Sequence, residues 1–133
     1  MKTAVLVGCG AMARGWLSAL RDTPALRDSV KIVGLVDLSA SLAQDLAQEF
    51  DLGDVVIGVD LEQVLSQTSP DILFDVVVPD ARKAVALAGL RHGCHVLSEK
   101  PMATSLQDAR EILSAAQASN LTQAVVQNRR FHA

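Results

Sequence analysis

Three small residues at fixed spacing lie close to the N-terminus, directly after the apolar run AVLV. Gly8, Gly10 and Ala13 form the pattern G-x-G-x-x-A. Gly8 permits a tight turn from a strand into a helix, Gly10 leaves the main chain bare, and Ala13 lets the helix pack closely on the sheet. The start of that helix, at Ala11 and Met12, would offer free N–H groups and positive partial charge to an anion. The pattern therefore predicts a binding site for the diphosphate of a dinucleotide.

Asp37 supplies the second part of this pattern. It ends the apolar segment KIVGLVD, at more than the usual spacing of about 20 residues from the glycines because the connection DTPALRDSV is long. A carboxylate there can accept hydrogen bonds from both hydroxyls of an adenosine ribose, and it repels a 2′-phosphate. No Lys or Arg follows Asp37 within the next ten residues. We therefore expect NAD as the cofactor rather than NADP. The alternative is a plain turn at Gly8 and Gly10, with Asp37 capping the next helix.

A third group, Glu99-Lys100-Pro101, follows the apolar segment HVLS. A dinucleotide lies across the carboxyl ends of the strands in a parallel sheet, so this turn is expected at its reactive end. Pro101 stiffens the turn, and a cis peptide bond is compatible with this position. Lys100 would then be held in one direction. The alternative is an ordinary surface turn that carries a solvated charge pair.

The elements that position these residues follow from an alternation of apolar and helical stretches. Apolar runs on consecutive positions are typical of parallel strands buried on both faces. A repeated β-α alternation implies right-handed crossovers, with helices on both faces of the sheet. We predict a Rossmann-type, doubly wound α/β fold in strand order 3-2-1-4-5-6. The strands are expected at residues 4–7, 31–36, 55–59, 72–78, 95–97 and 123–126, and the helices at 12–21, 41–49, 61–66, 81–92 and 106–118.

The expected helix ends carry their own signals. Asp60 with Gln63, and Thr104 with Gln107, have the spacing of capping boxes. Gly93 follows a cationic pair and predicts a left-handed end to the preceding helix. These signals support the expected boundaries.

Composition describes a globular chain of about one domain. Half of the 133 residues are hydrophobic, 20% are charged and the formal net charge is -3. The longest basic run is Arg129-Arg130, so no attraction to nucleic acid is expected. The N-terminal apolar run ends at Gly8, short of the ~7–15 residues of a secretory signal, and no run approaches the ~20 residues of a membrane span. Two cysteines suit a reducing compartment. We expect a cytoplasmic protein without membrane or nucleic-acid partners.

Some residues with chemical potential are interpreted as structural. His92, Cys94 and His95 would diverge around the helix end at Gly93, and no fourth ligand is evident, so no metal is expected. Cys9 and Trp16 are expected to pack in the core.

The chain resembles the glucose–fructose oxidoreductase / inositol dehydrogenase family, often written Gfo/Idh/MocA, over essentially its whole length. That resemblance implies a dinucleotide-binding domain followed by an α+β substrate domain. It also implies hydride transfer between NAD(P) and a small-molecule substrate, a sugar, polyol or related hydroxyl compound, by a homo-oligomer when the protein is full length. The residues that carry it are Gly8-Cys9-Gly10 with Ala13, Asp37, Val78-Pro79, the segment AGLRHGCHVLSEKPMA and the closing VVQNRRF.

The resemblance also implies roles for single residues. Lys100 matches the family lysine that touches the nicotinamide ribose and the substrate hydroxyl, where its cation would stabilise a developing alkoxide. Glu99 matches the glutamate near the nicotinamide ribose. Pro79, after Val78, matches the proline whose loop lies along the cofactor. Asn128, after the last strand, is expected to point toward the nicotinamide edge.

Two departures from the family pattern matter. Lys83 stands where the family often has a histidine, so either a contact on the nicotinamide side differs or Lys83 faces solvent. The sequence ends at Ala133, where the family's substrate domain would begin and where its acid/base residues, commonly an Asp/His pair, would follow. We therefore expect residues 1–133 to be a dinucleotide-binding domain that binds NAD but turns over little or nothing alone.

Two other classes stay open. A nucleotide-sensing regulatory protein could keep the fold without catalysis, although the presence of Lys100 argues against it. An interaction domain that binds no nucleotide is opposed by the glycine pattern.

Overall fold

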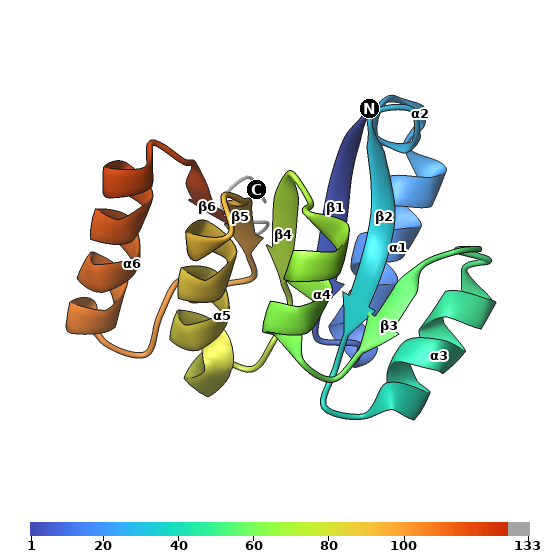
Figure 1. The fold of residues 1–133 in the computed structure, drawn as a ribbon, viewed down its shortest axis with the longest axis horizontal. Helices are drawn as coiled ribbons and strands as arrows, with labels where there is room; N and C mark the ends of the chain where they lie inside the picture. Colours follow the sequence, from blue (N-terminus) through green and yellow to red (C-terminus); the bar gives the residue numbers. More distant parts are fainter. Residues whose placement is uncertain (128–133) are drawn as a thin grey trace, which may run out of the picture.

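The computed structural model describes residues 1–127. Its strands form one parallel sheet in the predicted order β3-β2-β1-β4-β5-β6 (Figure 1). The strands are β1 (Lys2–Val7), β2 (Val30–Val36), β3 (Val56–Gly58), β4 (Ile72–Asp75), β5 (His95–Ser98) and β6 (Gln123–Val125). The helices are α1 (Ala11–Asp22), α2 (Pro24–Arg27), α3 (Ala40–Glu49), α4 (Leu61–Thr68), α5 (Pro79–Arg91) and α6 (Leu106–Ser119). The predicted doubly wound α/β fold is confirmed.

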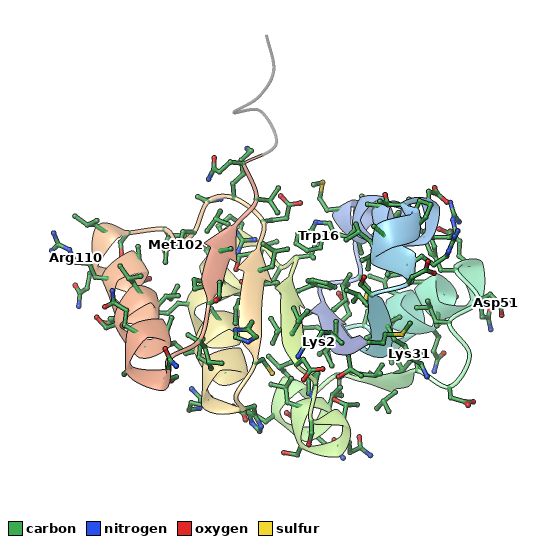
Figure 2. The ribbon with its side chains drawn as sticks, turned by 90° about the horizontal axis from the view of Figure 1, so that it is seen from above. Lys2, Trp16, Lys31, Asp51, Met102 and Arg110 are labelled. Carbon is green, nitrogen blue, oxygen red and sulfur yellow. The ribbon has the colours of Figure 1, made fainter. Side chains whose placement is uncertain are left out.

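Two apolar clusters, one on each face of the sheet, form the core. Helices α4, α5 and α6 lie in front of the sheet in Figure 1 and bury side chains such as Val64, Ala86 and Ile112 against it. Helices α1 and α3 cover the other face, where Ala13 and Leu46 are buried. The view from above separates the two helix layers (Figure 2). Covering both faces explains why the strands are apolar on consecutive positions.

Strand order reverses at β1, which pairs with β2 on one side and β4 on the other. Val7 is in register with Val36 of β2 and with Asp75 of β4. The loops that leave these three strands therefore start side by side at the carboxyl edge. In open α/β sheets this reversal is where ligands bind.

The loop after β4 starts earlier than predicted. This strand was expected to extend to residue 78, but it ends at Asp75, and Val78 is already the N-cap of α5. The N–H of Val76 still donates to the carbonyl of Val7 at 2.9 Å before the chain leaves the sheet. Pro79 then opens the helix, a position where its missing N–H costs nothing. The apolar run thus contains a strand end and a loop.

Other boundaries test the expected helix signals. Asp60 accepts a hydrogen bond from the N–H of Gln63 at 3.4 Å, so that cap is confirmed. The cap predicted at Thr104 is wrong, because Ser105 is the N-cap of α6 and accepts from the N–H of Asp108 at 3.1 Å. Gly93 ends α5 with a φ of +79°, as predicted. The short helix α2 lies in the long connection DTPALRDSV, where no helix was predicted.

Among residues 1–127, no helix combines the length and the apolar character that crossing a membrane requires.

Candidate functional site

The glycine loop, residues 8–10, joins β1 to α1 and needs its glycines for different reasons. Gly8 has a φ of +97°, and a Cβ there would lie 2.6 Å from the carbonyl oxygen of Val76. Gly10 has no heavy atom within 4 Å of a Cβ built on it, so its missing side chain leaves open space. Ala13 is fully buried against the sheet. The loop is therefore tight at Gly8 and open at Gly10.

The start of α1 presents main-chain donors to this open space. Gly10 is the N-cap and offers no side-chain acceptor, and the first turn contains no acidic residue. The N–H of Ala13 donates back to the carbonyl of Gly10 at 3.1 Å, while Ala11 and Met12 have no such partner among the described contacts. The first N–H groups of a helix lack intrahelical acceptors and carry positive partial charge. This end of α1 therefore favours an anion.

Asp37 lies beside the glycine loop. Its Oδ1 accepts a hydrogen bond from the N–H of Cys9 at 2.8 Å, and its Oδ2 accepts one from the N–H of Ser39 at 2.9 Å. The alternative in which Asp37 caps the next helix is wrong, because Ser39 is the N-cap of α3 and accepts from the N–H of Leu42. Each carboxylate oxygen keeps a lone pair for a further donor. The carboxylate is thus oriented but retains accepting capacity.

Two cavities meet at Gly10. The β2-side cavity, about 390 Å³, is lined by Gly8, Gly10 and Asp37 together with apolar side chains. Among these, Leu38 is 94% exposed and Val59 is 53% exposed. Large apolar side chains held this open at a cleft offer a surface for a flat apolar group.

The β5-side cavity, about 530 Å³, lies on the other side of the glycine loop. It is lined by Gly10, Ala11, Met12, Val76, Val77, Val78, Pro79, Arg82, Glu99 and Lys100. The residues predicted for the reactive end of the dinucleotide that the structure describes therefore line one cavity. They are Val78, Pro79, Glu99 and Lys100. Asn128 lies outside the described residues.

The turn after β5 is tied to α1 by a contact that sequence reasoning missed. The Nε1 of Trp16 donates to Oε1 of Glu99 at 2.6 Å, and the Trp16 ring lies 5.3 Å from that of Phe74. Trp16 is half-buried and extends from α1 toward the centre of the molecule (Figure 2). Lys100 is exposed, and its peptide bond to Pro101 is cis. Glu99 is therefore oriented at the border of the β5-side cavity.

A buried ion pair lies beneath the same cavity and was not predicted. Asp75 is 0% exposed and Arg82 is 1% exposed, with Nε 3.3 Å from Oδ2. Asp75 also accepts from the Oγ of Ser98 at 3.1 Å and from the N–H of Val77 at 3.3 Å. Burial raises the pKa of Asp75, and these partners oppose that rise. The sequence does carry a signal for a buried charge, because Asp75 is an acidic residue inside the apolar run ILFDVVV.

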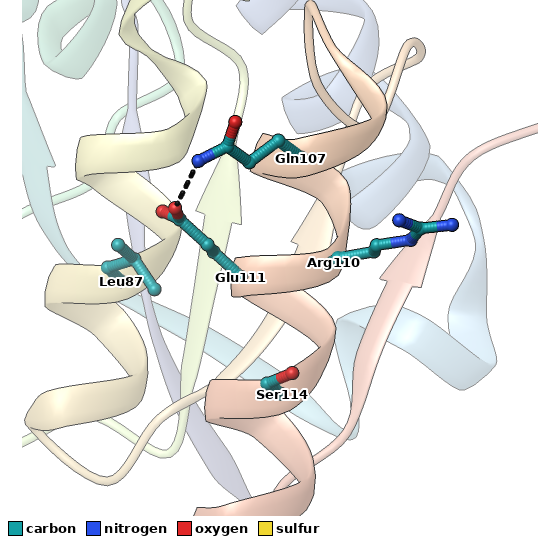
Figure 3. Close-up of a pocket in the computed structure, with 5 residues that line it drawn as sticks. All are labelled: Leu87, Gln107, Arg110, Glu111 and Ser114. Atoms are coloured by element: carbon teal, nitrogen blue, oxygen red, sulfur yellow. Dashed lines mark hydrogen bonds between the residues drawn. The ribbon is translucent and has the colours of Figure 1, made fainter.

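Lys83 has a different position from its neighbour Arg82. Its Nζ lies 2.5 Å from Glu111 and 3.4 Å from Asp108, both on α6, and the Glu111 hydrogen bond raises the pKa of Lys83. The shallow hollow between α5 and α6 beside this ion pair is lined by Leu87, Gln107, Arg110, Glu111 and Ser114 (Figure 3). No residue of the glycine loop lines it. Lys83 therefore links two helices on the outer surface.

The two histidines and the cysteine at the end of α5 take separate partners. His92 contacts Glu62 of α4, the Nδ1 of His95 accepts from the N–H of Thr122, and the thiol of Cys94 donates to the carbonyl of Pro70. Within residues 1–127, no three side chains of the kinds that bind metals are grouped to hold an ion.

Comparison with known proteins identifies the class. The model of the Gfo/Idh/MocA oxidoreductase family, with its NAD-binding Rossmann fold, matches residues 2–127. The chain belongs to this family. It is 32% identical over 112 residues to a 1,5-anhydro-D-fructose reductase of Ensifer adhaerens, covering 84% of this chain and 32% of that protein.

Solved structures show the same fold. A WlbA dehydrogenase from Bordetella pertussis, in complex with NADH and UDP-GlcNAcA, has a TM-score of 0.84 and 26% identity over 97% of this chain and 36% of its own. KijD10, a 3-ketoreductase from Actinomadura kijaniata in complex with NADP, shares the fold, with a TM-score of 0.79, 23% identity, and coverage of 93% of this chain and 36% of its own. The chain thus spans about a third of the length of the curated relative from Ensifer adhaerens.

Proposed function

We propose that residues 1–133 are the dinucleotide-binding domain of an NAD-dependent oxidoreductase. The whole protein transfers hydride between the nicotinamide and a sugar, polyol or related hydroxyl compound, and its substrate domain lies outside these residues. The observation that carries the proposal is the hydrogen bond between Asp37 and Cys9, which places a carboxylate beside the open glycine loop. Homo-oligomeric association and a cytoplasmic location stay predictions.

The diphosphate is assigned to the N-terminus of α1. Gly10 faces open space, so phosphate oxygens can come within hydrogen-bond distance of the main chain. The N–H groups of Ala11 and Met12 then donate to them, with the partial charge of the helix end adding to the attraction. Ala13 supports this arrangement from below by allowing α1 to pack against the sheet.

The adenosine half is assigned to the β2-side cavity. Asp37 there accepts from the ribose hydroxyls with the lone pairs that Cys9 and Ser39 leave free. The adenine then lies against the exposed side chains of Leu38 and Val59. Solved relatives bind NADH in one case and NADP in another. The preference for NAD in this chain therefore rests on the negative charge of Asp37, which repels a 2′-phosphate.

The nicotinamide half is assigned to the β5-side cavity. Val78 and Pro79 line one side, and Glu99 and Lys100 line the other. Glu99, held by Trp16, accepts from the nicotinamide ribose. When bound, the nicotinamide would supply the hydride acceptor. The hydroxyl proton would pass to a base of the substrate domain, and the Lys100 cation would stabilise the alkoxide character of the substrate oxygen as hydride leaves. Asn128 is assigned to the same edge by family resemblance. The sugar substrate is supported by the names of the relatives.

The cofactor assignment is tested by titrating the 133-residue chain with NADH and following the fluorescence of the dinucleotide. We expect saturable binding that Asp37→Ala weakens about tenfold, a loss of roughly 1.4 kcal/mol. Asp45→Ala is the matched control, because Asp45 is an exposed carboxylate on α3 outside both cavities. Absence of NADH binding, or equal affinities of wild type and Asp37→Ala, would contradict the proposal.

Catalysis is tested in the full-length protein with a panel of sugars and polyols. Lys100→Ala should retain NADH binding and lower kcat about 10²–10³-fold, the usual effect of removing one group that stabilises transition-state charge. The alternative outcome is a full-length protein that binds NADH and keeps its biological activity unchanged in Lys100→Ala. That result would identify a nucleotide-sensing regulator.

A further inference from the structure

A buried ion pair of opposite charges, between the sheet and α5, lies next to the β5-side cavity. Asp75 and Arg82 are the charged side chains that are fully buried within residues 1–127. Asp75 is the last residue of β4, and Arg82 lies on the first turn of α5. Taking such a pair out of water costs free energy, and apolar residues of similar volume often stabilise a core as well or better. The pair therefore calls for an explanation beyond core packing.

The guanidinium of Arg82 joins two loops. Its Nη2 donates to the carbonyl of Val77 in the loop after β4, and its Nη1 donates to the carbonyl of Pro101 in the loop after β5. Both loops border the β5-side cavity, and Arg82 itself lines it. A planar fork of donors can hold two acceptors at a fixed separation, which a single ammonium group cannot do in the same way.

Asp75 holds that fork in place. Its Oδ2 lies 3.3 Å from the Nε of Arg82, an ion-pair distance without hydrogen-bond alignment. Ser98 donates its hydroxyl to the same Oδ2, and Gln123 of β6 donates to Ser98 at 3.2 Å. The network thus connects three neighbouring strands with α5, and it converges on the two loops.

We propose that Arg82 is a positioning residue that bridges Val77 and Pro101 and thereby sets the width of the β5-side cavity. Lys100 immediately precedes Pro101, so the bridge also fixes where its side chain starts. The inference rests on the proposed function, because the width matters only if the nicotinamide half binds there. It assigns Arg82 no contact with cofactor or substrate.

The decisive variant is the pair Asp75→Asn/Arg82→Met, which removes both charges and the bridge together. Arg82→Met alone would leave the Asp75 carboxylate buried without its cation, which commonly unfolds a domain. Arg82→Lys is the second variant, because it keeps the charge balance and loses the fork. Lys83→Met is the control, because Lys83 is the adjacent cation but pairs with α6. Thermal unfolding verifies that each protein is folded.

Affinities for two ligands, ADP and NADH, distinguish a local effect on the β5-side cavity from a general loss of structure. Under the proposed function, ADP would occupy the β2-side cavity and the glycine loop, whereas NADH would also need the β5-side cavity. We expect the NADH dissociation constant to rise about tenfold in the double variant and several-fold in Arg82→Lys, with ADP affinity changed less than about twofold. Lys83→Met should bind both ligands like wild type.

Trp16, the single tryptophan, reports on the loop without any ligand. Because it donates to Glu99, next to Lys100, a displaced loop should shift its emission in both Arg82 variants and not in Lys83→Met. Unchanged emission together with unchanged NADH affinity would overturn the positioning role, as would equal losses of ADP and NADH affinity. A wild-type chain that binds neither ligand would overturn the proposed function instead, and Trp16 emission would still decide whether Arg82 holds the loop.

Discussion

Asp37 and Cys9 are joined by a 2.8 Å hydrogen bond from the backbone N–H of Cys9 to Oδ1 of the carboxylate. The bond connects the end of β2 with the glycine loop. The carboxylate proposed to bind the ribose and the loop proposed to bind the diphosphate are therefore joined directly. A change in the position of either would move the other. The two halves of a sequence pattern that are 28 residues apart are thus a single local structure.

The charge of Asp37 should control the choice between the two nicotinamide cofactors. Asp37→Asn keeps an acceptor for one backbone N–H but removes the negative charge that opposes a 2′-phosphate. We expect the ratio of NADPH to NADH affinity to rise about tenfold, because like-charge repulsion is lost. Parallel titrations with the two reduced cofactors measure this ratio. A ratio equal to that of wild type would show that the charge does not select the cofactor.

The two glycines of the loop should respond differently to the same substitution. Gly8→Ala forces a side chain onto a φ of +97° and against the Val76 carbonyl, so we expect unfolding free energy to fall by about 1–3 kcal/mol. Gly10→Ala meets no neighbour and should change stability by less than about 1 kcal/mol. Its methyl group nevertheless occupies the approach of the diphosphate, so NADH affinity should fall about tenfold or more. Chemical denaturation and NADH titration of both variants give the comparison.

If Gly10→Ala bound NADH normally, the diphosphate would have to lie elsewhere. If Gly8→Ala were as stable as wild type, the tight approach to Val76 would not be required for folding.

The two cysteines should be inert in the folded protein. Burial and the nearby Asp37 charge raise the pKa of Cys9 to about 12, and burial raises that of Cys94 to about 11. At pH 8 only about one Cys9 thiol in ten thousand is ionised, and the thiolate is the reactive form. A thiol reagent should therefore modify neither cysteine in the native chain and both in denaturant. Rapid modification of native protein would contradict this arrangement.

The ion pair between Lys83 and α6 should matter little. Both partners are substantially exposed, at 37% for Lys83 and 42% for Glu111. Exposed pairs of this kind contribute about 0–1 kcal/mol, and salt screens them. Lys83→Met should therefore lower the unfolding free energy by less than about 1 kcal/mol and leave NADH affinity unchanged. A large loss of NADH affinity would mean that Lys83 reaches the cofactor after all.

The strand order and the position of the glycine loop could be predicted because they depend on local patterns. Consecutive apolar residues identify buried parallel strands, and small residues after the first strand identify the turn. The cap at Asp60 was predicted correctly for the same reason. At Thr104 and Ser105, two adjacent residues can both cap a helix, and only the path of the loop selects Ser105.

The contacts that join distant segments could not be predicted from local patterns. Trp16 and Glu99 are 83 residues apart, and their hydrogen bond depends on how α1 lies over the sheet. The pairing of Asp75 with Arg82 has a sequence signal in the buried acid, but the partner follows from where α5 starts. The strand end at Asp75 was missed because the following valines are as apolar as a strand.

The most direct test of the central claim is a crystal structure of the chain with NADH. We predict diphosphate oxygens within about 2.7–3.2 Å of the backbone nitrogens at the start of α1, and both adenosine ribose hydroxyls within hydrogen-bond distance of the Asp37 carboxylate. A dinucleotide bound away from the glycine loop, or an Asp37 side chain turned away from the ribose, would contradict the account.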